Sequence, residues 1–139
     1  MRRIAVMAGI GSIAIVASAC GGSGNSAAKQ TAAVTTTYTT FFNAATPAPT
    51  ALTYLENGTV YQAQLTQLYK LMPKTLTAKV EKVTVTGNKA DVTYELISGG
   101  QSLLGHPSTG TAVNVSGKWL VSATTFCGLA SLAGATCAH

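Results

Sequence analysis

Three cysteines, four carboxylic acids and two histidines are the side chains of this 139-residue chain that are best suited to covalent, acid–base or metal chemistry. The first cysteine, Cys20, lies between two segments of opposite character. Residues 4–19 before it carry no charge and end in three small side chains, whereas the stretch GGSGNS after it is rich in glycine and serine. Cys20 is therefore placed for modification at a chain end rather than for packing in a core.

The segment before Cys20 has the organisation of a secretory signal peptide, residues 1–19. Met1-Arg2-Arg3 gives it a cationic start, and its apolar run is shorter than the ~20 residues of a bilayer-spanning helix. The order of small residues before Cys20 resembles the lipobox of bacterial lipoproteins. This resemblance implies a diacylglycerol on the Cys20 thiol, an acyl chain such as palmitate on the new amine, and a protein anchored on the extracytoplasmic face of the cell membrane. The alternative is an ordinary signal peptide followed by a free cysteine, which an oxidising compartment disfavours.

The remainder is predicted to be a lipidated flexible tether, residues 20–33, followed by one small domain, residues 34–139. Tether residues lack apolar periodicity. Loss of two arginines with the leader lowers the formal net charge from +5 to about +3. Beyond the leader there is no arginine, and the lysines are scattered. This pattern argues against a nucleic-acid partner and leaves the membrane, through the N-terminal lipid, as the expected contact.

With Cys20 acylated, Cys127 and Cys137 are the pair left to form a disulfide. The nine residues between them, GLASLAGAT, are flexible enough to close a loop. The alternative is a metal site with His139, but two cysteines and one histidine are too few ligands for an ordinary tetrahedral site. We therefore expect a disulfide, no metal and no cofactor.

The spacing of apolar residues predicts three helices followed by four strands. One helical face carries Val34, Tyr38, Phe41 and Phe42, and two further helices lie near residues 47–57 and 59–72. After Lys74 the pattern alternates, with hairpin turns at Gly87-Asn88 and Ser116-Gly117. The predicted class is α+β, with three N-terminal helices packed on one face of a four-stranded antiparallel sheet.

Two stretches, FFNAATPAPTALTYLENG and GQSLLGHPSTGTAVNVSGKWLVSATTFC, resemble the low-molecular-weight antigen family of actinobacterial (mycobacterial) cell-envelope lipoproteins. The resemblance runs from about Thr31 to His139. It implies a nuclear transport factor 2-like (cystatin-like) cone, in which helices pack on a curved sheet around an apolar mouth. It also implies a surface or secreted antigen without established enzymatic activity.

The candidate site residues are five aromatic side chains that either line a pocket or form the core: Tyr38, Phe41, Phe42, Tyr94 and Trp119. An isomerase-like reaction would need a carboxylate or histidine in an apolar pocket. Structural or solvated roles fit the available acids and the loop histidine better: Glu56, Glu81, Asp91, Glu95 and His106.

The sequence therefore predicts a lipid-anchored, non-enzymatic envelope protein that binds an apolar ligand or another envelope component. One alternative is a structural or interaction antigen without a ligand, for which we expect an exposed apolar patch and no cavity. The other is an isomerase-like enzyme, for which we expect a buried acid.

Overall fold

A computed structural model describes residues 23–137, so the predicted signal peptide, Cys20 and His139 lie outside the described residues. Within residues 23–137, no helix has the length and apolar character needed to cross a bilayer. The chain has the predicted α+β class. Its elements, in order, are α1 (Ser23–Phe41), α2 (Ala48–Leu52), α3 (Gln62–Leu71), β1 (Thr77–Thr86), β2 (Lys89–Ser98), β3 (Gln101–Ser102), β4 (Ser108–Val115), β5 (Lys118–Val121) and α4 (Ala123–Leu132).

The sheet is antiparallel, with the strand order β1-β2-β4-β5. Both predicted hairpin turns are confirmed, because Thr86 pairs with Lys89 and Val115 pairs with Lys118. The sheet has one strand more than predicted. The two-residue strand β3 folds back on the end of β2, and this short return places the following residues, 103 and 104, beside the end of the sheet.

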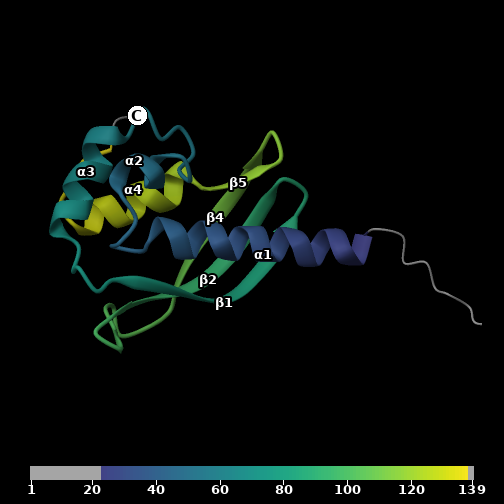
Figure 1. Ribbon diagram of the computed structural model, residues 1–139, viewed down its shortest axis with the longest axis horizontal. Coiled ribbons are helices and arrows are strands. Elements are labelled where there is room, and N and C mark those ends of the chain that lie inside the picture. Colours follow the sequence, from purple (N-terminus) through teal and green to yellow (C-terminus); the bar gives the residue numbers. More distant parts are fainter. Residues whose placement is uncertain (1–22, 138–139) are drawn as a thin grey trace, which may run out of the picture.

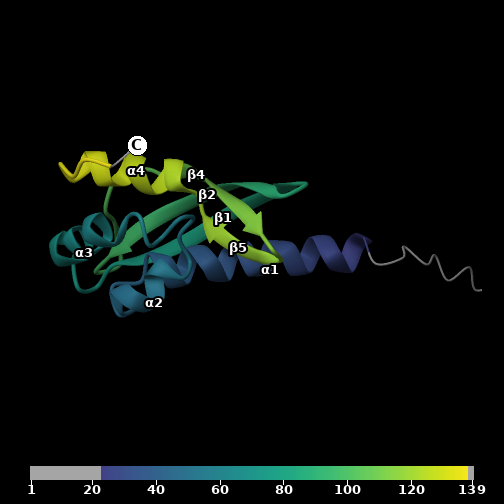
Figure 2. The same ribbon diagram turned by 90° about the horizontal axis from the view of Figure 1, so that it is seen from above.

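The helices are arranged differently from the prediction. Three helices precede the sheet, but only α1 lies along it, while α2, α3 and a fourth helix, α4, gather at one end (Figures 1 and 2). α2 has only five residues, and the chain after it pairs with the edge strand β5, because the Glu56 N–H donates to the Val121 carbonyl. The expectation of three helices on one sheet face is therefore wrong.

The first helix also begins earlier than predicted. α1 starts at Ser23, so the expected flexible tether over residues 20–33 is wrong for residues 23–33. Alanine, lysine and glutamine are good helix formers, and a helix that is already nucleated gains one hydrogen bond for each added residue. Most side chains from Ser26 to Ala33 are exposed, whereas Val34 is fully buried. This extension is thus helical without being packed in the core.

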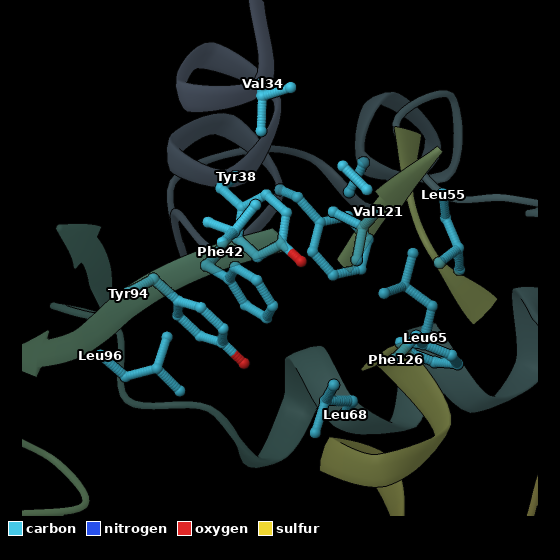
Figure 3. Close-up of a cluster of buried hydrophobic side chains, with 14 of the residues drawn as sticks. Val34, Tyr38, Phe42, Leu55, Leu65, Leu68, Tyr94, Leu96, Val121 and Phe126 are labelled. Carbon is cyan, nitrogen blue, oxygen red and sulfur yellow. The ribbon is translucent and has the colours of Figure 1, made fainter. Parts of the chain in front are cut away.

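The core lies between α1, the sheet and the helices at its end (Figure 3). Side chains of α1 point towards Tyr94 on β2 and towards Val121 and Phe126 (Figure 3). The Phe42 ring stacks on Tyr94 with 5.2 Å between ring centroids, and Phe41 meets Phe126 edge-on at 6.2 Å. These contacts fix α1 to the sheet and to α4 at the same time.

Candidate functional site

The five aromatic side chains identified from the sequence belong to the core. Each is at most 4 % exposed: Tyr38, Phe41, Phe42, Tyr94 and Trp119. The rings of Tyr38, Phe41, Phe42 and Tyr94 pack on one another rather than enclosing a space. Phe42 and Tyr94 also contribute to surface hollows at the end of the domain where α3 and α4 lie, and Trp119 lines a separate hollow beside the first half of α1. The space between these aromatic side chains is therefore filled by the side chains themselves.

The first hollow is an apolar groove of about 220 Å³ where α3, α4 and the end of the sheet meet. Its lining contains no polar side chain. We call it the leucine groove, defined by Phe42, Leu68, Leu71, Met72, Pro73, Leu76, Leu96, Leu103, Leu104, Leu129, Leu132 and Ala133. Two leucines on its rim are unusually exposed for their type, Leu71 at 68 % and Leu132 at 76 %. A contiguous patch of exposed leucines is the kind of surface that soluble monomers rarely retain without a function.

The second hollow is a cleft of about 670 Å³ between α4 and the strands β2 and β4, and it combines a mostly apolar lining with several hydroxyl-bearing side chains. We call it the hydroxyl cleft, defined by the side chains of Asp91, Thr93, Ser108, Thr109, Thr124 and Thr125. Gly128 lies in its wall on α4, and Leu129 and Leu132 line both the cleft and the leucine groove. The two hollows are therefore neighbours under one helix.

A small hydroxyl network holds the start of α4 against β4. The Ser122 hydroxyl, which caps α4, accepts from the Thr125 N–H at 3.2 Å and lies 2.6 Å from the Thr111 hydroxyl. Thr125 in turn accepts from the Thr111 N–H at 2.8 Å. The Tyr38 hydroxyl donates to the Thr111 carbonyl at 2.7 Å. These bonds connect α1, β4 and α4. They therefore hold α4, which forms one wall of the cleft, against the core.

Glu56 adds a second contact at the start of α4. One oxygen of its carboxylate accepts from the Ala123 N–H at 2.9 Å. A negative charge at a helix N-terminus is favourable because the first N–H groups have no partner within the helix. The role of Glu56 is thus structural.

The disulfide between Cys127 and Cys137 is confirmed. It joins the middle of α4 to the segment that follows the helix, and Cys137 is buried. Since Leu129 and Leu132 lie within the loop that the bond closes, the disulfide restrains the part of α4 that walls the leucine groove.

The remaining acid–base candidates do not form a cluster. Glu81 and Asp91 are exposed, Glu95 is half-buried, and His106 is exposed in the loop before β4. Of these, Asp91 lines the hydroxyl cleft. Between residues 23 and 137 there is no group of three or more His, Cys, Asp or Glu side chains that could hold a metal ion.

The buried tyrosines act as neutral groups. Burial raises the pKa of both Tyr69 and Tyr94 to about 12, and it raises the pKa of Tyr38 further still. At neutral pH their hydroxyls therefore keep their protons. Two of them serve as hydrogen-bond donors, Tyr38 to Thr111 and Tyr69 to the Phe41 carbonyl.

Sequence reasoning missed the leucine groove. Leu103 and Leu104 fall in a stretch that is otherwise glycine, serine and proline, and that composition predicts a polar loop. Two adjacent leucines in such a stretch were the available indication of a surface hydrophobic site. α4, which supplies the roof, was also not predicted, although Ser122 three residues before Thr125 is a capping pattern.

Comparison with known proteins identifies the family of this chain. The model of the family described as "Low molecular weight antigen MTB12, C-terminal domain" matches residues 27–137. The chain belongs to this family. The predicted family is therefore confirmed.

Two other comparisons add little. The search of curated proteins found no match. A solved structure from Campylobacter jejuni, provisionally described as an NTF2-like transpeptidase, aligns with a TM-score of 0.43 at 14% identity, over 70% of this chain and 97% of that chain.

Proposed function

We propose that this protein is a lipid-anchored component of the cell envelope that binds an aliphatic chain in the leucine groove and catalyses no reaction. The family description as an antigen is compatible with an envelope or secreted protein. The signal-peptide pattern and the lipobox resemblance around Cys20 support the anchor. The nuclear transport factor 2-like cone that the resemblance implies belongs to the same proposal.

The leucine groove is the observation that carries the binding function. Its lining offers only hydrocarbon, so it favours a ligand segment without charge or hydrogen-bonding groups. Its volume of about 220 Å³ is below the ~300–1,000 Å³ of sites that enclose a whole small molecule. The groove therefore suits a section of an aliphatic chain better than a compact ligand.

The acids give little support to an isomerase-like enzyme. Glu56 and Glu95 are the two that are partly buried, and neither lines the leucine groove or the hydroxyl cleft. The carboxylate of Glu56 is already engaged with α4. A proton-transfer site would instead need an acid aimed into an apolar pocket.

A protein partner on the same leucines is the second candidate. The strong exposure of Leu71 and Leu132 favours it, because exposed aliphatic side chains are suited to burial against another surface. Sedimentation of the protein with and without a bound alkanol separates the two. A chain-binding groove leaves a monomer, whereas a self-association surface gives a dimer that the alkanol dissociates.

The direct test is a titration of the purified full chain, produced without lipidation, with a series of straight-chain alkanols. Each methylene that enters the groove contributes about 0.8 kcal/mol, so affinity should rise about fourfold per carbon until the groove is full. Because Leu132 is mostly exposed, Leu132→Ser should leave the fold intact and weaken 1-decanol binding about tenfold.

Val60→Ser is the matched control. Val60 is also exposed, at 59 %, but it does not line the groove, so this variant should bind 1-decanol like the unchanged protein. Equal affinities for the two variants, or the absence of binding to any alkanol, would disprove the proposal.

A further inference from the structure

We infer that the leucine groove and the hydroxyl cleft form one continuous site for a single-chain amphiphile whose head group is rich in hydroxyls and carries no negative charge. This inference rests on the proposed function, since it places the aliphatic chain in the leucine groove and adds the head group. Leu129 and Leu132 line both hollows, so a ligand can pass from one to the other without leaving the surface of α4.

The stripe of α4 that overhangs the site changes polarity along its length. Thr124, Thr125, Gly128, Leu129 and Leu132 line the cleft, and their spacing puts them on one face of the helix. The hydroxyls lie at the start of α4 and the leucines at its end. One wall of the site is therefore amphiphilic.

Strand β2 contributes to the two hollows from its two faces. Asp91 and Thr93 line the hydroxyl cleft and Leu96 lines the leucine groove, and since side chains alternate along a strand, Leu96 points to the face opposite Asp91 and Thr93. The two hollows therefore join along α4, through the shared residues Leu129 and Leu132. A ligand with a polar head and a hydrocarbon tail fits this arrangement in a single orientation.

The chemistry of the cleft selects the head group. Within residues 23–137, hydrogen bonds engage the hydroxyls of Thr111 and Thr125 but not those of Thr93, Thr109 and Thr124. A free hydroxyl can both donate and accept, which matches the hydroxyls of a polyol.

Asp91 adds selectivity against anionic head groups. A carboxylate accepts hydrogen bonds, so Asp91 favours a donor such as a sugar hydroxyl and repels an anionic head. The cleft volume of about 670 Å³ lies within the ~300–1,000 Å³ usual for ligand sites, so a bulky head has room.

Gly128 provides a variant that blocks the cleft without disturbing the fold. A Cβ atom added there would have no heavy atom within 4 Å, so the helix can accept a larger side chain that projects into the cleft. We expect Gly128→Phe to weaken decyl maltoside binding by about tenfold or more and to leave 1-decanol binding unchanged. Val60→Phe is the control, because Val60 is exposed and lines neither hollow, and it should bind both probes normally.

The head group is tested with decyl compounds below their micelle-forming concentrations, titrated into the unlipidated full chain. Decyl maltoside should bind about tenfold or more tightly than decyl sulfate. Asp91→Asn should reduce that difference to about threefold or less, because it removes the charge that repels the sulfate.

The outcomes separate this inference from the proposed function. If 1-decanol binds and depends on Leu132, but decyl sulfate binds as well as decyl maltoside and Gly128→Phe has no effect, the shared site is disproved and the aliphatic groove stands. Tighter binding of decyltrimethylammonium than of decyl maltoside would overturn the hydroxyl-rich head. Failure of all the probes to bind overturns both proposals.

Discussion

Gly110 on β4 shows how closely the core is fitted at the level of single atoms. A Cβ atom there would lie 2.6 Å from the Tyr38 hydroxyl oxygen and 2.8 Å from a methyl carbon of Thr125. Both neighbours are fixed, since Tyr38 is fully buried and Thr125 belongs to the hydroxyl network at the start of α4. The absence of a side chain at this position is what lets α1 and α4 approach the same strand.

We therefore predict opposite effects for two alanine substitutions. Gly110→Ala should lower the free energy of unfolding by about 1–3 kcal/mol, because the added methyl group forces the neighbours apart. Gly128→Ala, where space is open, should raise it by about 0.5–1 kcal/mol through helix propensity. Urea unfolding measures both, and equal effects would contradict the packing described for Gly110.

Tyr94 makes stability depend on pH in the alkaline range. Its pKa is about 12 in the folded protein, compared with an ordinary value of about 10. Between these values the unfolded chain loses the phenolic proton while the folded chain keeps it, so stability is complete below about pH 10 and falls as the pH rises towards 12.

The expected slope from this one tyrosine is about 1.4 kcal/mol per pH unit between pH 10 and 12. Tyr94→Phe should remove the contribution of Tyr94 to this slope. The contribution of Tyr69, whose pKa is similarly raised, should remain in the variant. Urea unfolding at several alkaline pH values is the measurement. Parallel stability curves for the variant and the unchanged protein would show that Tyr94 does not titrate as described.

At the scale of elements, the features that the sequence predicted correctly are those that depend on the local pattern of residues. The aromatic stripe of α1 follows from helical spacing, and the two hairpins follow from their turn residues and flanking alternation. The core role of Tyr38, Phe42 and Tyr94 follows from the same pattern, because each lies on the apolar face of its element.

The candidate site depends on how elements meet, and local pattern does not contain that information. Leu71 ends α3, Leu103 follows β3, and Leu132 ends α4, so about 30 residues separate each from the next. Their meeting requires α4, whose sequence ATTFCGLASL contains two threonines and a glycine and gives only weak helical periodicity. The Ser122 cap and the link to Cys137 stabilise a helix that its own residues specify poorly.

The disulfide should therefore affect α4 more than the rest of the domain. Removing it with Cys127→Ser and Cys137→Ser together should lower the free energy of unfolding by somewhat under ~3 kcal/mol, as expected for a loop of this size. We also expect faster amide exchange in Leu129 and Leu132 and weaker 1-decanol binding, because the groove loses part of its wall.

The reduced but otherwise unchanged protein is the control and should behave like the double variant. Two results would show that the disulfide does not support the groove. One is amide exchange that accelerates equally in β2 and α4, and the other is a double variant that binds 1-decanol normally.

At the scale of the whole molecule, α1 separates the start of the described chain from the leucine groove. α1 has 19 residues and is about 28 Å long, and its first turn lies at the end opposite α3 and α4 (Figures 1 and 2). Ser23, where α1 begins, is only three residues after Cys20. An anchor at Cys20 would attach the domain by the end remote from the leucine groove, which leaves the groove accessible to other envelope components.

This arrangement requires Cys20 to be the anchored residue, and the three cysteines allow a clean comparison. Cys20→Ser in the exported full chain should move the protein from the membrane fraction to the soluble fraction, since two or three acyl chains supply the attachment. The paired variant Cys127→Ser with Cys137→Ser should stay in the membrane fraction, because those thiols bond to each other. Mass spectrometry of the mature amino terminus should find acylated Cys20, and an unmodified thiol there would remove the basis for the anchor.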